Sequence, residues 1–459
     1  MDSVRLQQQA RLKRVFALAV ALCLSIALMP ASAFADVRKA DVVLGQTVDA
    51  RGLSIAQCPS IDAEYAQVMG ADGTVYFERN ATNPTQIASI TKIMTAVVVL
   101  DAVANGSIAL DTSVEVSAAA AQVGESSAGL QEGDTMTLEA ALKALLVPSG
   151  NDAAVALAEK VAGSEEAFVG MMNDKAAELG CVDSLFANPH GLDDDGFEGD
   201  HHSCAADVAK IVQYAMLNDT FRTSVGGGDT TIPVTRADGT KADILLESTD
   251  GFLDIYEYAI GVKTGYTDLA GYSFAGAANK EGDELYAIVI HSTSEAQRFE
   301  DAKTLCEWVY EHKMMYQLAN SPETTTTTID GQSVQAPVVA EVAHSGWIDK
   351  TVKATLSDPT AAVEIFDLNG NVSQSLEFDT LSSTVHVGDK VGTITFKQRN
   401  AVIATQDLIA CEEVAAPDFF EGVGIWWDRL FRGFSGQPQT AQSITLNETP
   451  LVVDKTAAA

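Results

Sequence analysis

The spacing of apolar and polar residues predicts strands at two distant places in the chain and helices between them. Two apolar-rich runs flank the turn residues Ala71-Asp72-Gly73, which predicts a β-hairpin over Glu64–Glu78. Further strands are expected at Gly261–Thr267, Tyr272–Ala277 and Leu285–His291. Because strands stand at both ends of this region, we expect one antiparallel sheet assembled from segments that are far apart in sequence.

The segments between these strands have helical spacing. Residues Ala88–Asn105 are apolar nearly all round, which is typical of a helix buried at the centre of a domain. Further helices are expected over residues 137–161, with a break at Pro148-Ser149-Gly150, and over Met171–Leu179, Ala205–Leu217 and Glu295–Tyr316. The pattern therefore predicts an α+β fold, in which helices flank the antiparallel sheet and a helical lobe is inserted.

The composition changes beyond residue 320. Five consecutive threonines within Glu323–Thr328 indicate a Thr-rich linker over residues 321–328. After it, short runs such as Val352–Leu356 and Val391–Phe396 predict strands separated by turns. We therefore expect a first domain over residues 36–320 and a small all-β sandwich over residues 329–415.

An amphipathic helix is predicted over residues 416–435. Its apolar residues recur at three- and four-residue spacing and form one stripe: Phe419, Phe420, Val423, Trp426, Trp427, Leu430, Phe431 and Phe434. Such an aromatic stripe fits a helix that lies in a membrane interface. The alternatives are a helix docked on the β-domain and a contact with a protein partner. Residues 436–459 are expected to be a disordered tail.

The first 35 residues have the features of a signal peptide. Four basic residues precede the apolar run Val15–Met29, and Ala33-Phe34-Ala35 supplies small residues before a cleavage site at Asp36. We therefore expect export, to the outer face of the cytoplasmic membrane or to the cell wall. The remaining five cysteines have no metal-site spacing and are expected to be buried free thiols. A net charge of −34 argues against nucleic acid as a partner, because phosphates would be repelled.

A serine and a lysine stand three residues apart at the start of the predicted central helix. Helical spacing places Ser89 and Lys92 on one face. The lysine can accept the serine proton if burial or a nearby positive charge destabilises its ammonium form, and Lys263 could supply that charge. The backbone N–H of Ser89 would then point toward a developing oxyanion. Taken alone, the pair is better explained by a capping serine and a surface lysine.

Two further motifs place polar groups where the surrounding pattern does not require them. Ser149-Gly150-Asn151 interrupts an apolar segment and can present a hydroxyl and an amide to a cleft, although a capped helix junction would look the same. Lys263-Thr264-Gly265 lies on a predicted strand, where its ammonium and hydroxyl could hold a carboxylate and Gly265 would let a ligand backbone approach. A solvated edge-strand lysine is the alternative. The three motifs in this order favour one active site.

The chain resembles D-alanyl-D-alanine carboxypeptidases, which are low-molecular-mass penicillin-binding proteins. The resemblance covers most of residues 55–435 and rests on these segments: Ala88–Ala96, Ser149–Ala154, Asn188–Asp193, Gly261–Thr267 and Val387–Ile394. It implies the penicillin-binding/β-lactamase-like transpeptidase fold for the first domain. It also implies removal of the terminal D-alanine from peptidoglycan pentapeptide stems, and covalent inhibition by β-lactams.

The resemblance further implies a role for each matching residue of the catalytic set. Ser89 would form the acyl-enzyme and Lys92 would accept its proton. Ser149 and Asn151 would serve proton transfer and substrate positioning. Neither a cofactor nor a metal is expected, and we interpret His201 and His202 as loop histidines.

The implied substrate-binding residues lie on and beside the second strand region. Lys263 and Thr264 would bind the terminal carboxylate of the substrate, and Arg298 resembles an arginine near the same place. Gly265 and Tyr266 complete the set, with the backbone N–H groups of Ser89 and Tyr266 forming the oxyanion hole.

Three alternatives remain open. A serine β-lactamase shares the first and third motifs, but class A enzymes use an additional loop glutamate that Asn188–Asp193 does not resemble, and such enzymes lack a trailing β-domain. A transpeptidase differs only in the acceptor of the acyl group. An inactive envelope-binding module would keep the pocket without performing the reaction.

Overall fold

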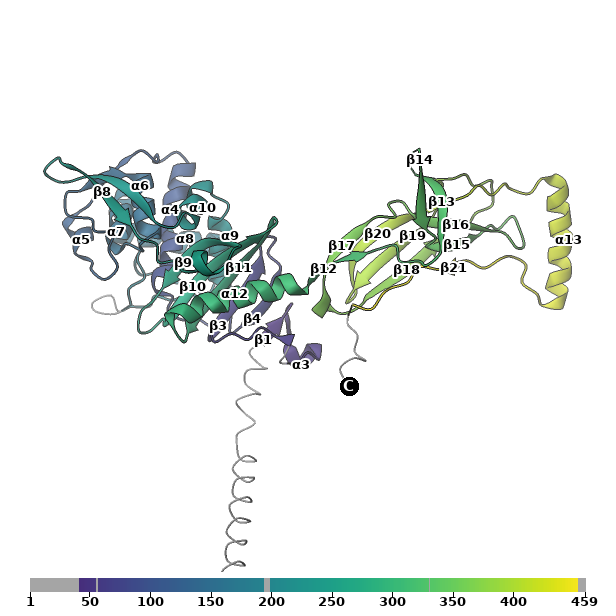
Figure 1. Ribbon diagram of the computed structural model, residues 1–459, viewed down its shortest axis with the longest axis horizontal. Helices are drawn as coiled ribbons and strands as arrows, with labels where there is room; N and C mark the ends of the chain where they lie inside the picture. The colour runs from purple at the N-terminus through teal and green to yellow at the C-terminus, as the bar shows by residue number, and fades with distance from the viewer. Residues whose placement is uncertain (1–40, 55–56, 194–198, 330, 453–459) are drawn as a thin grey trace, which may run out of the picture. The chain divides into compact units, whose positions relative to one another are not determined.

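The structure is a computed structural model that describes residues 41–54, 57–193, 199–329 and 331–452 (Figure 1). The chain divides into two compact units, Met1–Trp308 and Val309–Ala459, and each is described by itself. The signal peptide expected over residues 1–35 lies outside the described residues. In the described ranges, no helix is both long and apolar enough to span a membrane.

The first unit is built on a seven-stranded antiparallel sheet with the strand order β2-β1-β4-β3-β11-β10-β9. The strands are β1 (Asp41–Val43), β2 (Gln46–Thr47), β3 (Tyr65–Gly70), β4 (Val75–Arg79), β9 (Ala259–Gly265), β10 (Tyr272–Lys280) and β11 (Asp283–Ser292). The predicted hairpin supplies β3 and β4, and Val68 of β3 pairs with Ala287 of β11. The sheet is therefore assembled from distant segments, as the sequence pattern predicts.

Helices cover both faces of this sheet. Consecutive strand residues point to opposite sides, so two neighbouring residues of one strand can contact helices on different faces. Phe274 of β10 contacts Phe299 of α12 (Glu295–His312), with ring centroids 5.0 Å apart (Figure 1). The next residue, Ala275, belongs to the main core on the other face, together with residues of α4 (Lys92–Ala104) and α9 (Ala205–Ala215). Most of α4 is buried, as its uniformly apolar sequence predicts.

The helical lobe lies in the chain between β4 and β9. Besides α4 and α9 it contains η2 (Ala88–Thr91), α5 (Ala118–Gln122), α6 (Leu138–Leu146), α7 (Asn151–Ala162), α8 (Glu165–Glu178), α10 (Asp219–Gly226) and α11 (Phe252–Ile255). The lobe also contains a four-stranded sheet that the sequence analysis did not predict: β5 (Ser113–Glu115), β6 (Thr135–Thr137), β7 (Thr230–Thr235) and β8 (Lys241–Leu246). In the two longer strands, β7 and β8, exposed positions alternate with buried or half-buried ones, so their sequences lack a continuous apolar signal.

The second unit is rich in strands. One six-stranded sheet has the order β18-β19-β20-β16-β15-β21, and β12-β17 and β13-β14 form two further pairs. The strands are β12 (Lys313–Gln317), β13 (Thr324–Ile329), β14 (Gln332–Pro337), β15 (Ala340–Ala343), β16 (Thr351–Leu356), β17 (Ala362–Phe366), β18 (Val372–Phe378), β19 (Lys390–Gln398), β20 (Ala401–Ala410) and β21 (Ile444–Thr445). Val352, Ile394 and Leu408 lie in one apolar core. A small β-rich domain thus follows the first unit, as predicted.

Three boundaries expected from the sequence are wrong. The threonines expected to form a linker form β13, which pairs with β14, because β-branched residues favour extended backbone. The helix expected to reach Tyr316 ends at His312, and β12 begins at the next residue and pairs with β17. The expected disordered tail includes β21, which pairs with β15, and Asn447, whose buried side chain donates to the carbonyl of Leu318 at 2.9 Å.

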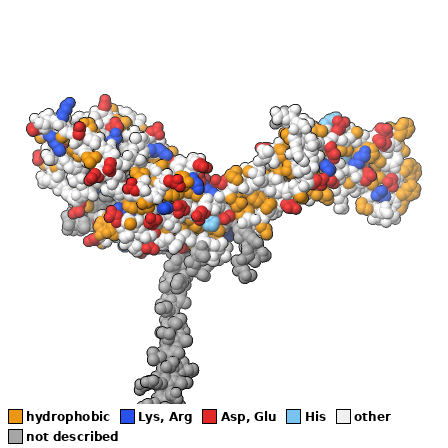
Figure 2. All heavy atoms as spheres, in the orientation of Figure 1, with side chains coloured by type: hydrophobic (Ala, Val, Ile, Leu, Met, Phe, Trp, Pro, Cys, Tyr) orange, Lys and Arg blue, Asp and Glu red, His pale blue; other side chains and the backbone are white. Residues whose placement is uncertain are grey.

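The helix α13 (Phe419–Ser435) occupies the segment where an amphipathic helix is predicted. A capping box formed by Asp418 and Glu421 satisfies backbone N–H groups at its start. None of its residues is buried, and Phe420 and Phe434 are each 82% exposed. Figure 2 shows hydrophobic side chains gathered over this helix. In the described structure the aromatic stripe therefore faces solvent rather than the core of the β-rich unit.

Candidate active site

The start of the central helix brings the predicted serine and lysine into contact. Ser89 lies in η2 and Lys92 begins α4, one turn further on. The Lys92 Nζ lies 2.6 Å from the Ser89 Oγ and donates to the carbonyl oxygen of His190 at 2.9 Å. A capping serine with a surface lysine is therefore not what the structure contains, because Lys92 is fully buried.

The surroundings of Lys92 favour its neutral amine. Burial lowers the pKa of Lys92 well below its usual value, and the positive charge of Lys263 lowers it further. The carboxylate of Asp152 acts in the opposite direction. Asp152 is engaged elsewhere, since it accepts hydrogen bonds from the Ser127 hydroxyl at 2.6 Å and from the backbone N–H of Leu130 at 3.1 Å. An uncharged lysine that touches a serine hydroxyl can accept its proton.

The second motif turns two polar side chains toward the same place. Ser149 sits between α6 and α7 with φ of +68°, a left-handed conformation that is uncommon outside glycine. The Ser149 Oγ and the Asn151 Oδ1 are buried and have no hydrogen-bond partner in the described structure. The Asn151 Nδ2 donates to the carbonyl of Gly124 at 3.0 Å, which fixes the amide. Unpaired buried polar atoms are costly, so their presence at a cleft points to a ligand that completes them.

The third motif places a buried cation on β9. The Lys263 Nζ donates to the Thr264 carbonyl at 3.0 Å, and the Thr264 Oγ1 lies 2.7 Å from the Thr249 Oγ1. Burial lowers the pKa of Lys263 to about 7, and the nearby Arg298 guanidinium contributes to this shift. The solvated edge-strand lysine considered from the sequence is therefore excluded, since Lys263 is 1% exposed.

Two glycines let other segments of the first unit pack closely against η2. A Cβ on Gly265 would lie 2.7 Å from the Ile87 carbonyl oxygen, so glycine allows β9 to pack against η2. Gly191, with φ of +91°, lies even closer: a Cβ there would be 1.9 Å from the Ala88 carbonyl oxygen. Gly265 therefore has a packing role within the protein, and it also lines the cleft, where the motif predicts the approach of a ligand backbone.

Arg298 and Tyr266 lie at the far side of the third motif. The Arg298 side chain projects from α12, is buried, and donates to the Gly265 carbonyl at 3.3 Å and to the Glu295 carboxylate at 3.2 Å. Tyr266 is half-exposed, and its ring lies 4.5 Å from that of Tyr272. Arg298 therefore reaches the region of β9 even though it is distant in sequence.

One cleft joins these groups. It has a volume of about 610 Å³ and lies entirely within the first unit. Seven of the nine predicted site residues line it: Ser89, Ser149, Asn151, Thr264, Gly265, Tyr266 and Arg298. The other two, Lys92 and Lys263, are buried and contact Ser89 and Thr264 of the lining. Sequence reasoning missed the remaining lining residues: Glu125, Ser126, Leu192, Thr249, Thr267, Asp268, Tyr272 and Glu295.

His201 is a buried residue that contacts Thr91 of η2. Its Nδ1 accepts the backbone N–H of Ala187 at 3.0 Å, so its Nε2 carries the proton and donates to the Thr91 Oγ1 at 2.8 Å. Burial lowers the pKa of His201 to about 4. Both nitrogens are therefore occupied by protein groups, which fits the interpretation of this residue as a loop histidine.

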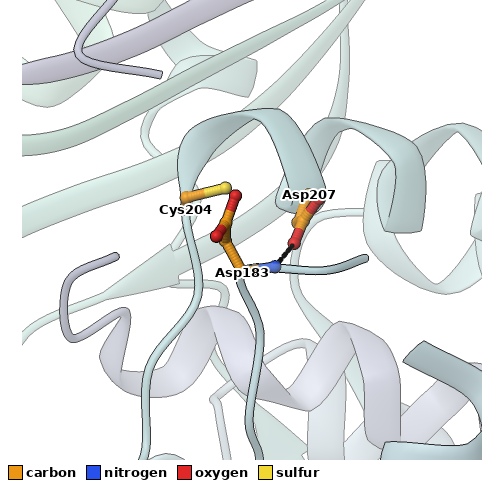
Figure 3. A group of neighbouring side chains, drawn as sticks. All are labelled: Asp183, Cys204 and Asp207. Carbon is orange, nitrogen blue, oxygen red and sulfur yellow. Dashed lines mark hydrogen bonds between the residues drawn. The ribbon is translucent and has the colours of Figure 1, made fainter. Parts of the chain in front are cut away.

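Figure 3 shows Asp183, Cys204 and Asp207, whose ligand atoms lie within 4.8 Å of one another in the described part of the chain. Asp207 already accepts hydrogen bonds from the Asp183 backbone N–H at 2.8 Å and from the Lys210 ammonium at 2.9 Å. Burial raises the pKa of the Cys204 thiol to about 11, which disfavours the thiolate that binds metals. We interpret the cluster as a hydrogen-bonded junction and assign no metal to it.

Comparison with known proteins gives a consistent result. Peptidase family S11, D-alanyl-D-alanine carboxypeptidase, matches residues 53–294. DacF, a D-alanyl-D-alanine carboxypeptidase of Bacillus subtilis, is 29% identical over 358 residues, which are 76% of this chain and 84% of that protein. DacC, a D-alanyl-D-alanine carboxypeptidase of Escherichia coli, is 29% identical over 389 residues, which are 82% of this chain and 90% of that protein.

Solved structures extend the comparison to the fold. The crystal structure of the Streptomyces K15 DD-transpeptidase is 33% identical, has a TM-score of 0.52, and covers 55% of this chain and 98% of that chain. The fold is therefore that of the penicillin-binding enzymes. The family match covers more than half of the chain and includes all three motifs. The chain belongs to the D-alanyl-D-alanine carboxypeptidase family.

Proposed function

We propose that Ser89 is the nucleophile of this serine-type D-Ala-D-Ala carboxypeptidase, and that Lys92 is the base that activates it. The observation that carries the proposal is the 2.6 Å contact between the Lys92 Nζ and the Ser89 Oγ in a buried site. A serine hydroxyl is a weak nucleophile until a base removes its proton. An amine that is held neutral by burial and by a second cation meets that requirement.

Acylation begins when Lys92 takes the hydroxyl proton and the Ser89 Oγ attacks the carbonyl carbon of the penultimate D-alanine. The developing oxyanion is stabilised by the backbone N–H groups of Ser89 and Tyr266. When the amide C–N bond breaks, the proton is returned to the nitrogen of the leaving D-alanine, with the unpaired hydroxyl of Ser149 in position to relay it. Water then hydrolyses the ester and restores the Ser89 hydroxyl.

Substrate recognition uses the cationic end of the cleft. The free C-terminal carboxylate of the stem peptide is held by the Lys263 ammonium and the Thr264 hydroxyl, with the Arg298 guanidinium close by. At the other end, the unpaired Asn151 Oδ1 accepts an N–H of the peptide backbone. A β-lactam, which carries both a carboxylate and a strained amide, fits the same two regions and forms the same ester with Ser89. These steps require neither a metal nor an organic cofactor.

The test is release of D-alanine from diacetyl-Lys-D-Ala-D-Ala by the purified full chain. We expect release by the parent protein and none by Ser89→Ala. The matched control is Ser107→Ala, which removes an exposed hydroxyl that bonds only to Asn105 among the described contacts. Rapid turnover of penicillin without release of D-alanine would favour a β-lactamase. Transfer of the acyl group to an added amine, at the expense of hydrolysis, would favour a transpeptidase.

We further propose that the protein acts outside the cytoplasm, with α13 lying on the membrane surface. The support is the solvent-facing aromatic stripe described above, together with a side chain that holds the helix in place. The Arg429 guanidinium of α13 donates to the carbonyl oxygens of Ser345 and Trp347, at 2.6 and 3.0 Å. A helix with a fixed orientation and an unburied aromatic face suits insertion into the boundary between headgroups and acyl chains.

A further inference from the structure

A short turn is wedged between the strand and the helix that carry the two cations of the cleft. The turn begins at Thr249, whose hydroxyl lies 2.7 Å from that of Thr264 on β9. It continues to Gly251, where a Cβ would lie 2.9 Å from the ring of Phe299, the residue after Arg298 on α12. Asp250 stands between these two contacts and so lies behind the proposed carboxylate-binding groups.

The carboxyl of Asp250 is buried and only partly satisfied. Its Oδ1 accepts the backbone N–H of Phe252 at 3.0 Å, which fixes the side chain at the start of α11. Its Oδ2 is buried and has no hydrogen-bond partner in the described structure. Asp250 as a whole is 7% exposed. A buried carboxylate oxygen without a donor is unfavourable unless a nearby positive charge compensates it.

Three charged groups influence Asp250, one from each element around it. Lys263 on β9 and Arg298 on α12 lower its pKa, and Asp254 on α11 raises it, although burial dominates and raises the pKa to about 7. The influence is mutual, because Asp250 raises the pKa of Lys263 while Arg298 lowers it. Two buried cations that repel each other are thus accompanied by one buried acid.

We propose that Asp250 is a positioning residue that acts through Lys263, as the buried counter-ion that keeps its ammonium protonated and aimed at the substrate carboxylate. This rests on the role proposed above for Lys263. Without Asp250, the repulsion by Arg298 and the burial of Lys263 act unopposed. Lys263 then loses its proton at a lower pH, and both carboxylate binding and the electrostatic pressure on Lys92 weaken.

The test is the pH dependence of acylation by a fluorescent penicillin, measured as a second-order rate constant with the full chain. In Asp250→Asn, we expect the alkaline limb to move to lower pH by about one unit, as loss of an adjacent opposite charge requires. At a pH on that limb the variant then reacts about ten-fold more slowly, whereas the rate constants below the limb coincide. Asp250→Glu, which keeps the charge, should restore most of the difference. The matched control is Asp111→Asn, an exposed carboxyl that neither lines the cleft nor influences Asp250 or Lys263, and that should leave the profile unchanged.

A profile of Asp250→Asn that superimposes on that of the parent protein would overturn the inference. So would an equal loss at every pH accompanied by a lower unfolding temperature, because that pattern describes a structural defect. Lys263→Gln separates this inference from the function on which it rests. If Lys263→Gln reacts slowly and Asp250→Asn does not, only the counter-ion role fails; if Lys263→Gln reacts normally, the proposed carboxylate site fails as well.

Discussion

Gly191→Ala should disable the active site through a single added methyl group. The new Cβ would lie 1.9 Å from the carbonyl oxygen of Ala88 and 2.8 Å from the Oγ1 of Thr91. The first distance is about 1.5 Å shorter than an ordinary van der Waals contact, so one of the two segments must move by about that amount. Ala88 precedes Ser89, the proposed nucleophile, and His190, the residue before Gly191, supplies the carbonyl oxygen that accepts a hydrogen bond from the Lys92 amine. The displacement therefore falls on both members of the proposed catalytic pair, Ser89 and Lys92.

A misplacement of roughly 1 Å costs on the order of 100-fold in rate, or about 2.7 kcal/mol of transition-state stabilisation. We therefore expect the second-order rate constant for acylation by a fluorescent penicillin to fall at least that far in Gly191→Ala. The matched control is Gly239→Ala, at a position with φ of +85° where a Cβ meets nothing within 4 Å. It carries the same backbone strain without the clash and should lose some stability but acylate normally. Thermal unfolding of both variants shows whether each is folded. A folded Gly191→Ala that acylates at the parent rate would refute the reasoning.

Three further predictions concern other parts of the molecule. Ser149→Ala should slow acylation by about 100-fold without lowering the unfolding temperature, because its hydroxyl makes no bond in the described structure; a variant that reacts normally would remove the proposed relay. His201 has a pKa of about 4 in the folded protein, so its stabilising contribution is complete above pH 6.5 and is lost as the pH falls toward 4. The unfolding temperature of the parent protein should fall over this pH range, and in His201→Asn it should depend less on pH. Equal pH dependence of the unfolding temperature in the two proteins would contradict the prediction. Replacing Trp427 and Phe431 of α13 by serine should reduce sedimentation with phosphatidylglycerol vesicles at least ten-fold, and unchanged sedimentation would argue against membrane contact.

The residues predicted from the three motifs line the cleft or contact its lining, whereas Leu192 and Thr267, which lie in segments that resemble the family, were not predicted to line it. Ser89 and Lys92 are one helical turn apart, so their contact follows from local geometry. Lys263 is buried, as a role in an active site predicts, although its position on a strand would equally allow a solvent-exposed lysine. Arg298 lies in a helix with no distinguishing motif, and only the resemblance to the family indicated it.

Other parts of the site depend on tertiary structure. Asp250 resembles any aspartate in a polar turn, and it is buried where its neighbours Thr249 and Gly251 contact β9 and α12. Thr249 enters the cleft for the same reason. Gly191 resembles any loop glycine until the chain brings it against Ala88. These positions carry no local pattern, because the atoms that constrain them come from segments far away in sequence.

The errors in fold prediction have a related cause. A run of five threonines predicts a linker, yet β-branched residues favour a strand once a partner such as β14 is available. The tail around Asn447 has a polar composition, but backbone pairing of β21 with β15 orders it. In both cases pairing with a distant strand decided the conformation.

The most direct test of the central claim is the site of covalent attachment of penicillin. The full chain is incubated with benzylpenicillin, digested, and its peptides are sequenced by mass spectrometry. We expect one penicilloyl adduct, on the hydroxyl of Ser89, and a much slower appearance of that adduct in Lys92→Met. An adduct on Ser149 or on any other residue, or an unchanged rate in Lys92→Met, would contradict the account.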